Sequence, residues 1–148
     1  ILILLVRFKY LLLVNYNMDL TKKERDCIIK INEYESAFPL RLVELAKRVG
    51  VKAPTAYQLV KRLSSKGLVS ENRGVIIPTK RGRQAYKDII MAHRCVETLL
   101  NRAGVPKNCA CTEAQKIDYK LTPSYVKLLY KFIGSPKNCP HGKPVIVS

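Results

Sequence analysis

The chain has 148 residues, of which 27 are Lys or Arg and 11 are Asp or Glu, so its formal net charge is +16 at pH 7. This length suits one domain or a small pair of domains, and a hydrophobic content of 47% argues against a disordered basic tail. The excess charge favours a polyanionic partner such as DNA, because each neutralised phosphate releases a counterion. An odd number of cysteines, five, indicates a reducing compartment, so we expect a cytoplasmic protein.

Residues 1–20 are interpreted as an atypical apolar amino-terminal extension. The first 14 residues carry two basic side chains within the apolar run and fall short of the roughly 20 residues that a membrane-spanning helix needs. The chain does not begin with Met, whereas Met18 directly precedes a helix start. We therefore expect residues 1–17 to lie upstream of the working fold and expect no membrane partner. The alternative is a membrane-associated protein, in which deletion of residues 1–17 would abolish membrane partitioning.

A capping box marks the first predicted helix. The Thr21 hydroxyl can accept from the third helical amide, and the Glu24 side chain can reach back to the cap. Apolar residues then recur at helical spacing until Pro39 disfavours a helical residue before it. These signals predict a helix over residues 22–36.

Two short helices with a tight connection come next and predict a helix-turn-helix. The first covers residues 40–49 and stops at Gly50, and the second tolerates Pro54 in its first turn. The outward face of the second helix combines polar side chains that can form hydrogen bonds with basic side chains, which is typical of a recognition helix. An ordinary solvated helix would carry a similar face. Together with basic residues outside this helix, the predicted DNA contacts are Arg41, Lys52, Thr55, Tyr57, Gln58, Lys61, Arg62 and Arg73.

A hairpin wing is predicted after Gly67, with strands over residues 68–70 and 75–77 around a turn at 71–74. Its tip carries Arg73, which is suitably placed for a phosphate. Helix, helix-turn-helix and basic wing in this order predict a winged helix-turn-helix DNA-binding domain over residues 21–82.

Helices are predicted over residues 83–103, 112–120 and 123–133. The first has more apolar surface than one small winged domain covers, which favours a homodimer. Residues 83–148 are therefore interpreted as a helical dimerisation domain with candidate metal ligands. The predicted fold class is mainly α with a small β wing, a winged helix-turn-helix followed by an α-helical dimerisation domain.

Several motifs are similar to those of one known family. They are Pro39–Arg41 before Glu44–Ala46, Ala53–Gln58, Gly67–Val69, Pro78–Gly82, His93–Leu100 and Cys139–Val145. In this order they resemble the metal-dependent regulators of the diphtheria toxin repressor and manganese transport regulator family over roughly residues 21–146. The resemblance implies a homodimeric repressor that senses manganese or ferrous iron and binds a palindromic operator. Some members add a carboxy-terminal barrel, and this chain resembles the shorter ones.

Candidate metal ligands lie in the predicted helix over residues 83–103, in the segment that follows it and in the first predicted helix. His93 and Glu97 are four residues apart and share a helix face, and imidazole with carboxylate suits a divalent transition ion. The resemblance implies a further ligand in the first helix. The complete candidate set is Asp26, His93, Glu97, Cys111, Gln115 and Asp118.

The sequence departs from the family pattern near Asp118. The family has Glu-His or a close equivalent where this chain has Asp118 and Tyr119, and Cys, Met or Glu where it has Gln115. A tyrosine is a poor ligand at neutral pH because its phenol stays protonated. A metal-independent winged-helix protein, either architectural or a cysteine-based redox sensor, is therefore the alternative function.

A second arrangement of ligands remains open. Cys109, Cys111, Cys139 and His141 offer three thiols and an imidazole, which is a set for zinc or an iron-sulfur cluster, although the spacing is not that of a zinc ribbon. Cys27 and Cys95 lie among apolar positions and are expected to pack as small hydrophobic residues. No nucleophile with a base, paired acids or phosphate-binding glycine loop has meaningful spacing, so we do not expect an enzyme.

Overall fold

The computed structural model describes residues 18–147, and the chain divides into two compact units. The amino-terminal unit is Thr21–Ile89, and the carboxy-terminal unit is centred on Ile90–Ser148. The predicted extension over residues 1–17 lies outside the described residues. None of the helices in the part of the chain that the structure describes is long and apolar enough to cross a membrane.

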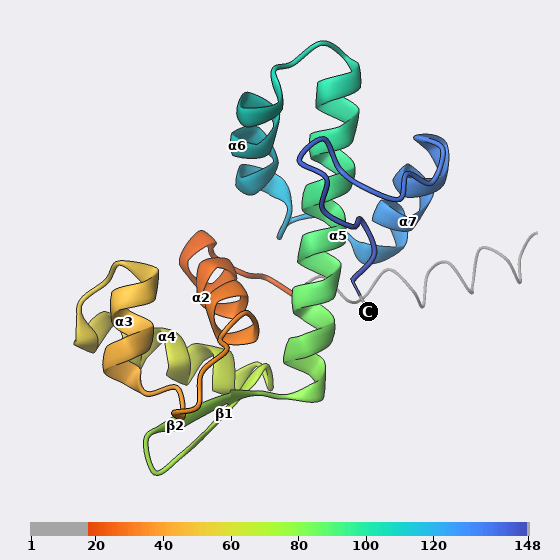
Figure 1. Ribbon diagram of the computed structural model, residues 1–148. Helices are drawn as coiled ribbons and strands as arrows, with labels where there is room; N and C mark the ends of the chain where they lie inside the picture. The colour runs from red at the N-terminus through yellow and green to blue at the C-terminus, as the bar shows by residue number, and fades with distance from the viewer. Residues whose placement is uncertain (1–17, 148) are drawn as a thin grey trace, which may run out of the picture. The chain divides into compact units, whose positions relative to one another are not determined.

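Helix α2, Lys22–Asn32, opens the amino-terminal unit (Figure 1). Its capping box is formed, since the Glu24 amide donates to Thr21 Oγ1 at 3.2 Å and the Thr21 amide donates to Glu24 Oε2 at 2.9 Å. The helix ends four residues before the predicted position 36. The side chain of Asn32 donates to the carbonyl of Ile28 at 2.8 Å, and such local bonds compete with continued helix.

Helices α3, Leu42–Val49, and α4, Ala53–Ser65, form the helix-turn-helix. Gly50 adopts a left-handed conformation with φ of 73°, which ends α3 and turns the chain into α4. Helix α3 begins two residues later than predicted, because Arg41 forms an antiparallel bridge with Val75 of the hairpin.

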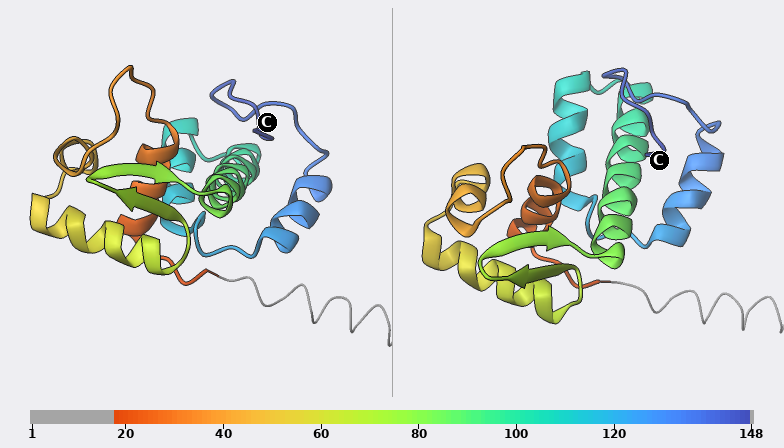
Figure 2. Two further views of the ribbon diagram at one scale, coloured as in Figure 1. Left: turned by 90° about the horizontal axis from the view of Figure 1, so that it is seen from below. Right: turned by 60° about the horizontal axis from the view of Figure 1, so that its bottom comes forward.

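Strands β1, Val69–Asn72, and β2, Val75–Pro78, pair antiparallel as a hairpin, drawn as two arrows in Figure 2. The turn contains only Arg73 and Gly74, with φ values of 50° and 78°. Positive φ at both central residues is the geometry that matches the twist of the flanking strands. The strands therefore extend closer to the tip than the predicted turn over 71–74 allowed.

Helix α5, Lys80–Arg102, starts three residues before the predicted position 83. The Thr79 hydroxyl accepts from the Gly82 amide at 3.0 Å and so caps the helix. Gly82 must remain small, because a Cβ there would lie 1.9 Å from the carbonyl oxygen of Leu68. This close contact joins the start of α5 to the chain entering the hairpin.

The carboxy-terminal unit contains the second half of α5, then α6, Lys107–Ile117, and α7, Pro123–Phe132. Helix α6 lies earlier than the predicted 112–120, because it starts directly after Pro106, whose carbonyl accepts from the Ala110 amide at 2.9 Å. The tail then returns to this unit and buries Val145. The core consists of Ala92, Cys95, Val126, Ile133 and Val145.

Candidate metal centre and DNA-reading face

Helix α4 separates apolar from polar side chains. Its inward residues Ala56, Leu59, Val60 and Leu63 are at most 4% exposed. The outward residues Thr55, Tyr57, Gln58 and Lys61 are all exposed, as is Lys52 just before the helix. The Lys61 ammonium lies 5.4 Å from the centre of the Tyr57 ring, a cation-π distance that holds both side chains on the same face. A polar and cationic face is therefore presented to solvent.

Arg62, another predicted DNA contact, is engaged within its own unit. Its Nε lies 3.1 Å from Glu24 Oε1, and the Lys66 ammonium lies 2.8 Å from Glu24 Oε2. Glu24 is 1% exposed, so it needs such partners in order to remain charged. Burial alone would raise the pKa of Glu24, but the bonds from Lys66, Thr21 and Arg62 together lower it. Arg62 thus links α4 to α2 and has a structural role in addition to any contact with DNA.

Arg41 and Arg73 meet at the hairpin. Arg41 Nη1 donates to the carbonyl of Arg73 at 3.3 Å, and the Arg73 side chain is exposed at the turn. Arg41 therefore braces the wing from the start of α3.

Glu97 is the centre of a cluster in the carboxy-terminal unit. It is 1% exposed and lies one helical turn after His93 on α5, with His93 Nε2 3.8 Å from Glu97 Oε2. Cys111 of α6 approaches the same imidazole, with its Sγ 3.4 Å from His93 Nε2. Three different donor chemistries thus surround one point: imidazole, carboxylate and thiol.

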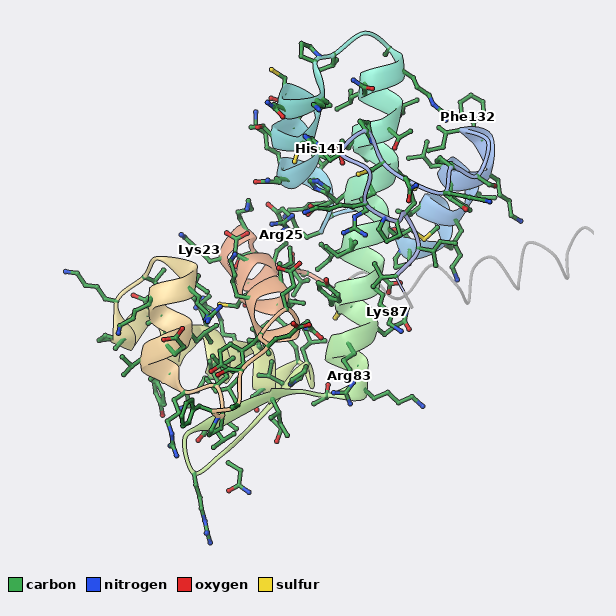
Figure 3. All side chains as sticks on the ribbon, in the orientation of Figure 1. Lys23, Arg25, Arg83, Lys87, Phe132 and His141 are labelled. Atoms are coloured by element: carbon green, nitrogen blue, oxygen red, sulfur yellow. The ribbon has the colours of Figure 1, made fainter. Side chains whose placement is uncertain are left out.

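His141 reaches this cluster from the carboxy-terminal tail. Figure 3 shows it beside α5 and α6, and its Nδ1 contacts Glu97 Oε1. One ligand atom from each of Glu97, Cys111 and His141 lies within 4.8 Å of the other two. Within the described residues, Glu97 meets these donors rather than a lysine or arginine.

Asp118 and Gln115, both predicted ligands, contact His93 and Cys111 rather than Glu97. Asp118 Oδ2 lies 3.0 Å from Nδ1 of His93, the ring nitrogen that faces away from Cys111. The Gln115 amide lies 3.9 Å from the Cys111 sulfur. Tyr119, which replaces a family histidine, is half-buried and has the Lys120 ammonium 5.4 Å from its ring centre.

Of the remaining predicted ligands, Cys109 and Cys139 are not part of this cluster, whereas Asp26 belongs to the other unit. Asp26 lies on α2 in the amino-terminal unit, 2.6 Å from the Lys22 ammonium and 3.1 Å from Arg25 Nη1. Cys109 is exposed on α6, while Cys139 is buried in the tail. Of the alternative set of three thiols and one imidazole, the structure joins only Cys111 and His141.

Cys27 and Cys95 are fully buried and unsuited to redox chemistry. Desolvation by burial raises the pKa of Cys27 to about 12 and that of Cys95 to about 11. Both stay protonated at neutral pH, and the thiol is much less reactive than the thiolate.

Asn108 is the contact that sequence reasoning missed. Its Oδ1 lies 3.0 Å from Nε2 of His141, although the two residues are 33 positions apart. Nothing in the local sequence marks an asparagine in the first turn of α6 as a partner of a tail histidine.

Residues 79–146 match the family model of the iron-dependent repressor metal-binding and dimerisation domain. The chain belongs to the iron-dependent repressor family. The predicted resemblance and the predicted fold class are thereby confirmed. The domain matched by this model includes every residue of the cluster around Glu97.

Curated relatives of the chain include transcriptional regulators. An uncharacterized HTH-type transcriptional regulator of Aeropyrum pernix is 32% identical over 108 residues, covering 72% of this chain and 59% of that protein. Transcriptional regulator MntR of Salmonella typhimurium is 30% identical over 99 residues, covering 66% and 59%. The chain thus spans less than two thirds of the length of these curated relatives.

Solved structures share the fold. A hypothetical protein from Sulfolobus solfataricus has a TM-score of 0.78 at 28% identity, covering 86% of this chain and 100% of that one. A manganese-dependent transcriptional repressor in complex with manganese has a TM-score of 0.66 at 27% identity, covering 84% and 58%. The iron-dependent repressor fold therefore extends over both units of the chain.

Proposed function

We propose that the protein is a sequence-specific DNA-binding transcriptional regulator, of the repressor type, whose DNA affinity responds to a divalent metal. The observation that carries the proposal is the cluster of Glu97, Cys111 and His141, since one chain combines it with a helix-turn-helix. Manganese and ferrous iron are the ions that the family resemblance suggests.

DNA would be read by α4 from the major groove. Gln58 and Thr55 can hydrogen-bond base edges, while Lys61 and Lys52 suit phosphates. Arg73 at the wing would add a backbone contact. A homodimer would place two copies of α4 on half-sites about one helical turn apart, which predicts a palindromic operator. As a DNA-binding regulator, the protein would act in the cytoplasm.

The donors present fit a divalent transition ion. The residues that would hold it are His93, Glu97, Cys111 and His141, which offer two imidazole nitrogens, a carboxylate oxygen and a sulfur. Such ligands suit iron, zinc and manganese to different degrees. The bound ion would supply positive charge beside a carboxylate that is 1% exposed, and so stabilise the ligated arrangement of α5, α6 and the tail.

Asp26 is proposed to take part in the metal response of DNA binding. The family resemblance assigns a ligand to its position, and α2 packs against α3 and α4 in the DNA-reading unit. A metal ion held by Asp26 would therefore act on the helices that read DNA. Replacement of Asp26 by Ala is then expected to remove the metal response of DNA binding while metal-free binding persists.

The test is DNA affinity with and without metal. Duplexes are selected from a random pool with protein loaded with zinc, ferrous iron or manganese, and affinity is then measured for the selected and a random duplex in reducing buffer. We expect at least one ion to strengthen binding to the selected duplex by about 5- to 150-fold, the usual range of coupling between two sites. Equal affinity for the selected duplex in chelator and in every metal would contradict the proposed metal response.

A further inference from the structure

The hairpin is joined to the start of α3 by Arg41, a predicted DNA contact. We propose that Arg41 is instead a positioning residue, which fixes Arg73 at the wing tip so that its side chain enters the minor groove beside each half-site. The operator is then read at a second place, with a preference for base pairs that lack an amino group in the minor groove. This inference rests on the proposed reading of DNA by α4 but not on the proposed metal response.

Two hydrogen bonds hold the backbone of the wing tip. Arg41 Nη1 donates to the carbonyl of Arg73 at 3.3 Å, and the Gly74 amide donates to Glu71 Oε1 at 2.7 Å. A Cβ on Gly74 would lie 3.2 Å from the same Arg41 nitrogen, so the guanidinium lies directly against the turn. The place of the tip is therefore set by side chains outside the turn.

The backbone before α3 is joined to the hairpin as well. The Ile76 amide donates to the carbonyl of Leu40 at 2.9 Å, and Arg41 forms the antiparallel bridge with Val75. Helix α3 packs against α4, and α4 packs against β1. These contacts lie within one unit and fix the separation between the recognition helix and the wing tip. A base read by α4 and a base pair under the wing would then lie at a constant spacing.

Arg73 has a backbone conformation that arginine rarely adopts. Its φ is 50°, and in the described part of the chain Ser135 is the only other non-glycine residue with positive φ. A turn of this type favours Asn, Asp or Gly at this position, because these residues tolerate the left-handed region. Local strain of this kind points to a role for the residue that bears it. Because the Arg73 side chain is exposed, that role concerns a binding partner.

A guanidinium at a fixed point suits the minor groove better than a phosphate. Phosphates repeat along both strands and accept a cation from many positions, whereas the minor groove is only about 6 Å wide. A narrow, A·T-rich minor groove concentrates negative potential and attracts arginine, and a guanidinium is more weakly hydrated than an ammonium. A G·C pair adds an amino group in this groove. Arg73 is therefore expected to favour pairs without that group.

Inosine separates reading in the minor groove from reading in the major groove. An inosine·C pair lacks the minor-groove amino group, as A·T does, but presents the donor and acceptor pattern of G·C to the major groove. The base pairs under the wing are those at which Arg73→Ala removes the protection of the selected duplex from hydroxyl radicals. Duplexes with A·T, inosine·C or G·C at these pairs are then titrated in the buffer used for selection.

We expect wild type to bind the A·T and inosine·C duplexes at least about fivefold more tightly than the G·C duplex, the low end of the effect of one changed base pair. Arg73→Ala and Arg41→Ala should each bring this ratio close to one. The double variant should lower it no further, because Arg41 acts through Arg73. Arg48→Ala is the matched control, since it removes a cation of α3 that pairs with Glu44 on the surface, and it should keep the ratio.

Two further measurements separate positioning from a direct contact and from a loss of fold. If Arg41 contacted a phosphate, Arg41→Ala would weaken all three duplexes equally and reduce the salt dependence by about one counterion. Arg73→Asn should unfold at a urea concentration no lower than wild type and yet lose the ratio, because asparagine suits the turn. The proposal is overturned by equal binding of the three duplexes to wild type, by a ratio that Arg41→Ala retains, or by no change in protection in Arg73→Ala.

The outcomes also separate this inference from the proposed function. A preference that depends on Arg41, together with DNA affinity that ignores metal, would leave the inference standing and contradict the metal response. Discrimination between the selected and a random duplex without any preference under the wing would leave the proposed function standing and overturn the inference. A wild type that prefers no duplex would overturn both.

Discussion

The two units bury a carboxylate in different ways. In the amino-terminal unit, Glu24 is 1% exposed and is met by the cations Arg62 and Lys66 at 3.1 and 2.8 Å. In the carboxy-terminal unit, Glu97 is equally buried but is met by His93, His141 and the thiol of Cys111. Cations of the chain itself neutralise the first carboxylate, whereas the second is surrounded by the proposed ligands of a metal.

The neighbours of a buried glutamate therefore distinguish one that stabilises the fold from one that is a candidate metal ligand. An uncompensated buried charge destabilises a fold, so Glu24 carries its own partners. Glu97 instead has neighbours with lone pairs, which under the proposed function would bind a metal ion. Replacing each glutamate by glutamine, which keeps the shape and removes the charge, should therefore have opposite consequences in the two units.

The largest effect is expected for Glu97→Gln on metal affinity. Changes behind metal ligands already cost 10- to 100-fold, so loss of a ligand should cost more than about 100-fold. The metal-free variant should be as stable as wild type or more stable, because a buried negative charge is gone. Calorimetric metal titration and denaturant unfolding in chelator measure the two quantities. Metal affinity in Glu97→Gln equal to that of wild type would show that Glu97 is not a metal ligand.

The next effect is expected for Glu24→Gln on the free energy of unfolding. Loss of charged hydrogen bonds to Arg62 and Lys66 should lower it by about 1–3 kcal/mol, with the low end favoured because both partners are partly exposed. Glu44→Gln is the control, since its bond to Arg48 is on the surface. The control should change stability by less than about 1 kcal/mol. Equal effects of the two variants would remove the distinction between buried and exposed acids.

A smaller effect is expected for Gln58→Ala, which tests the exposed face of the amino-terminal unit. Loss of a base contact should weaken the selected duplex by about tenfold, or about 1.4 kcal/mol, and leave a random duplex unchanged. Lys61→Ala should weaken both duplexes similarly and reduce the salt dependence by about one counterion. Affinities at several salt concentrations measure both. Equal losses on both duplexes for both variants would contradict the assignment of Gln58 to base reading.

The smallest effect is expected from pH. The pKa of Glu24 in the folded unit lies below its ordinary value of 4.5, so the stability from its ionised form is present above that value. It is lost as pH falls through the lower folded pKa. Between about pH 5 and about pH 3, wild type should lose more stability than Glu24→Gln. Parallel pH profiles of unfolding for the two proteins would contradict this account.

Local signals predicted most of the fold. The capping box at Thr21, the stop at Gly50 and the small turn residue Gly74 act within a few residues, so sequence alone places α2, α3 and the hairpin. Helix ends were less accurate where a tertiary contact decides them. The bridge between Arg41 and Val75 delays α3, and no local pattern contains it.

The site was only partly predictable for the same reason. His93 and Glu97 lie one turn apart on a helix, so their pairing follows from spacing. His141 meets Glu97 across 44 positions of sequence. Its place two residues after Cys139 led instead to a predicted thiol cluster with Cys109, Cys111 and Cys139. Arg62 pairs with Glu24 across 38 positions, which an outward helix face cannot reveal. These two contacts, of His141 with Glu97 and of Arg62 with Glu24, follow from the fold and not from any local sequence motif.

The proposed metal response requires that metal binding and DNA binding strengthen each other equally. If metal strengthens binding to the selected duplex, that duplex must strengthen metal binding by the same factor, because the two affinities share one coupling free energy. Zinc affinity is therefore measured for the protein alone, with the selected duplex and with a random duplex. The account predicts tighter zinc binding with the selected duplex, by the factor found for DNA. Identical zinc affinity in all three mixtures would contradict it.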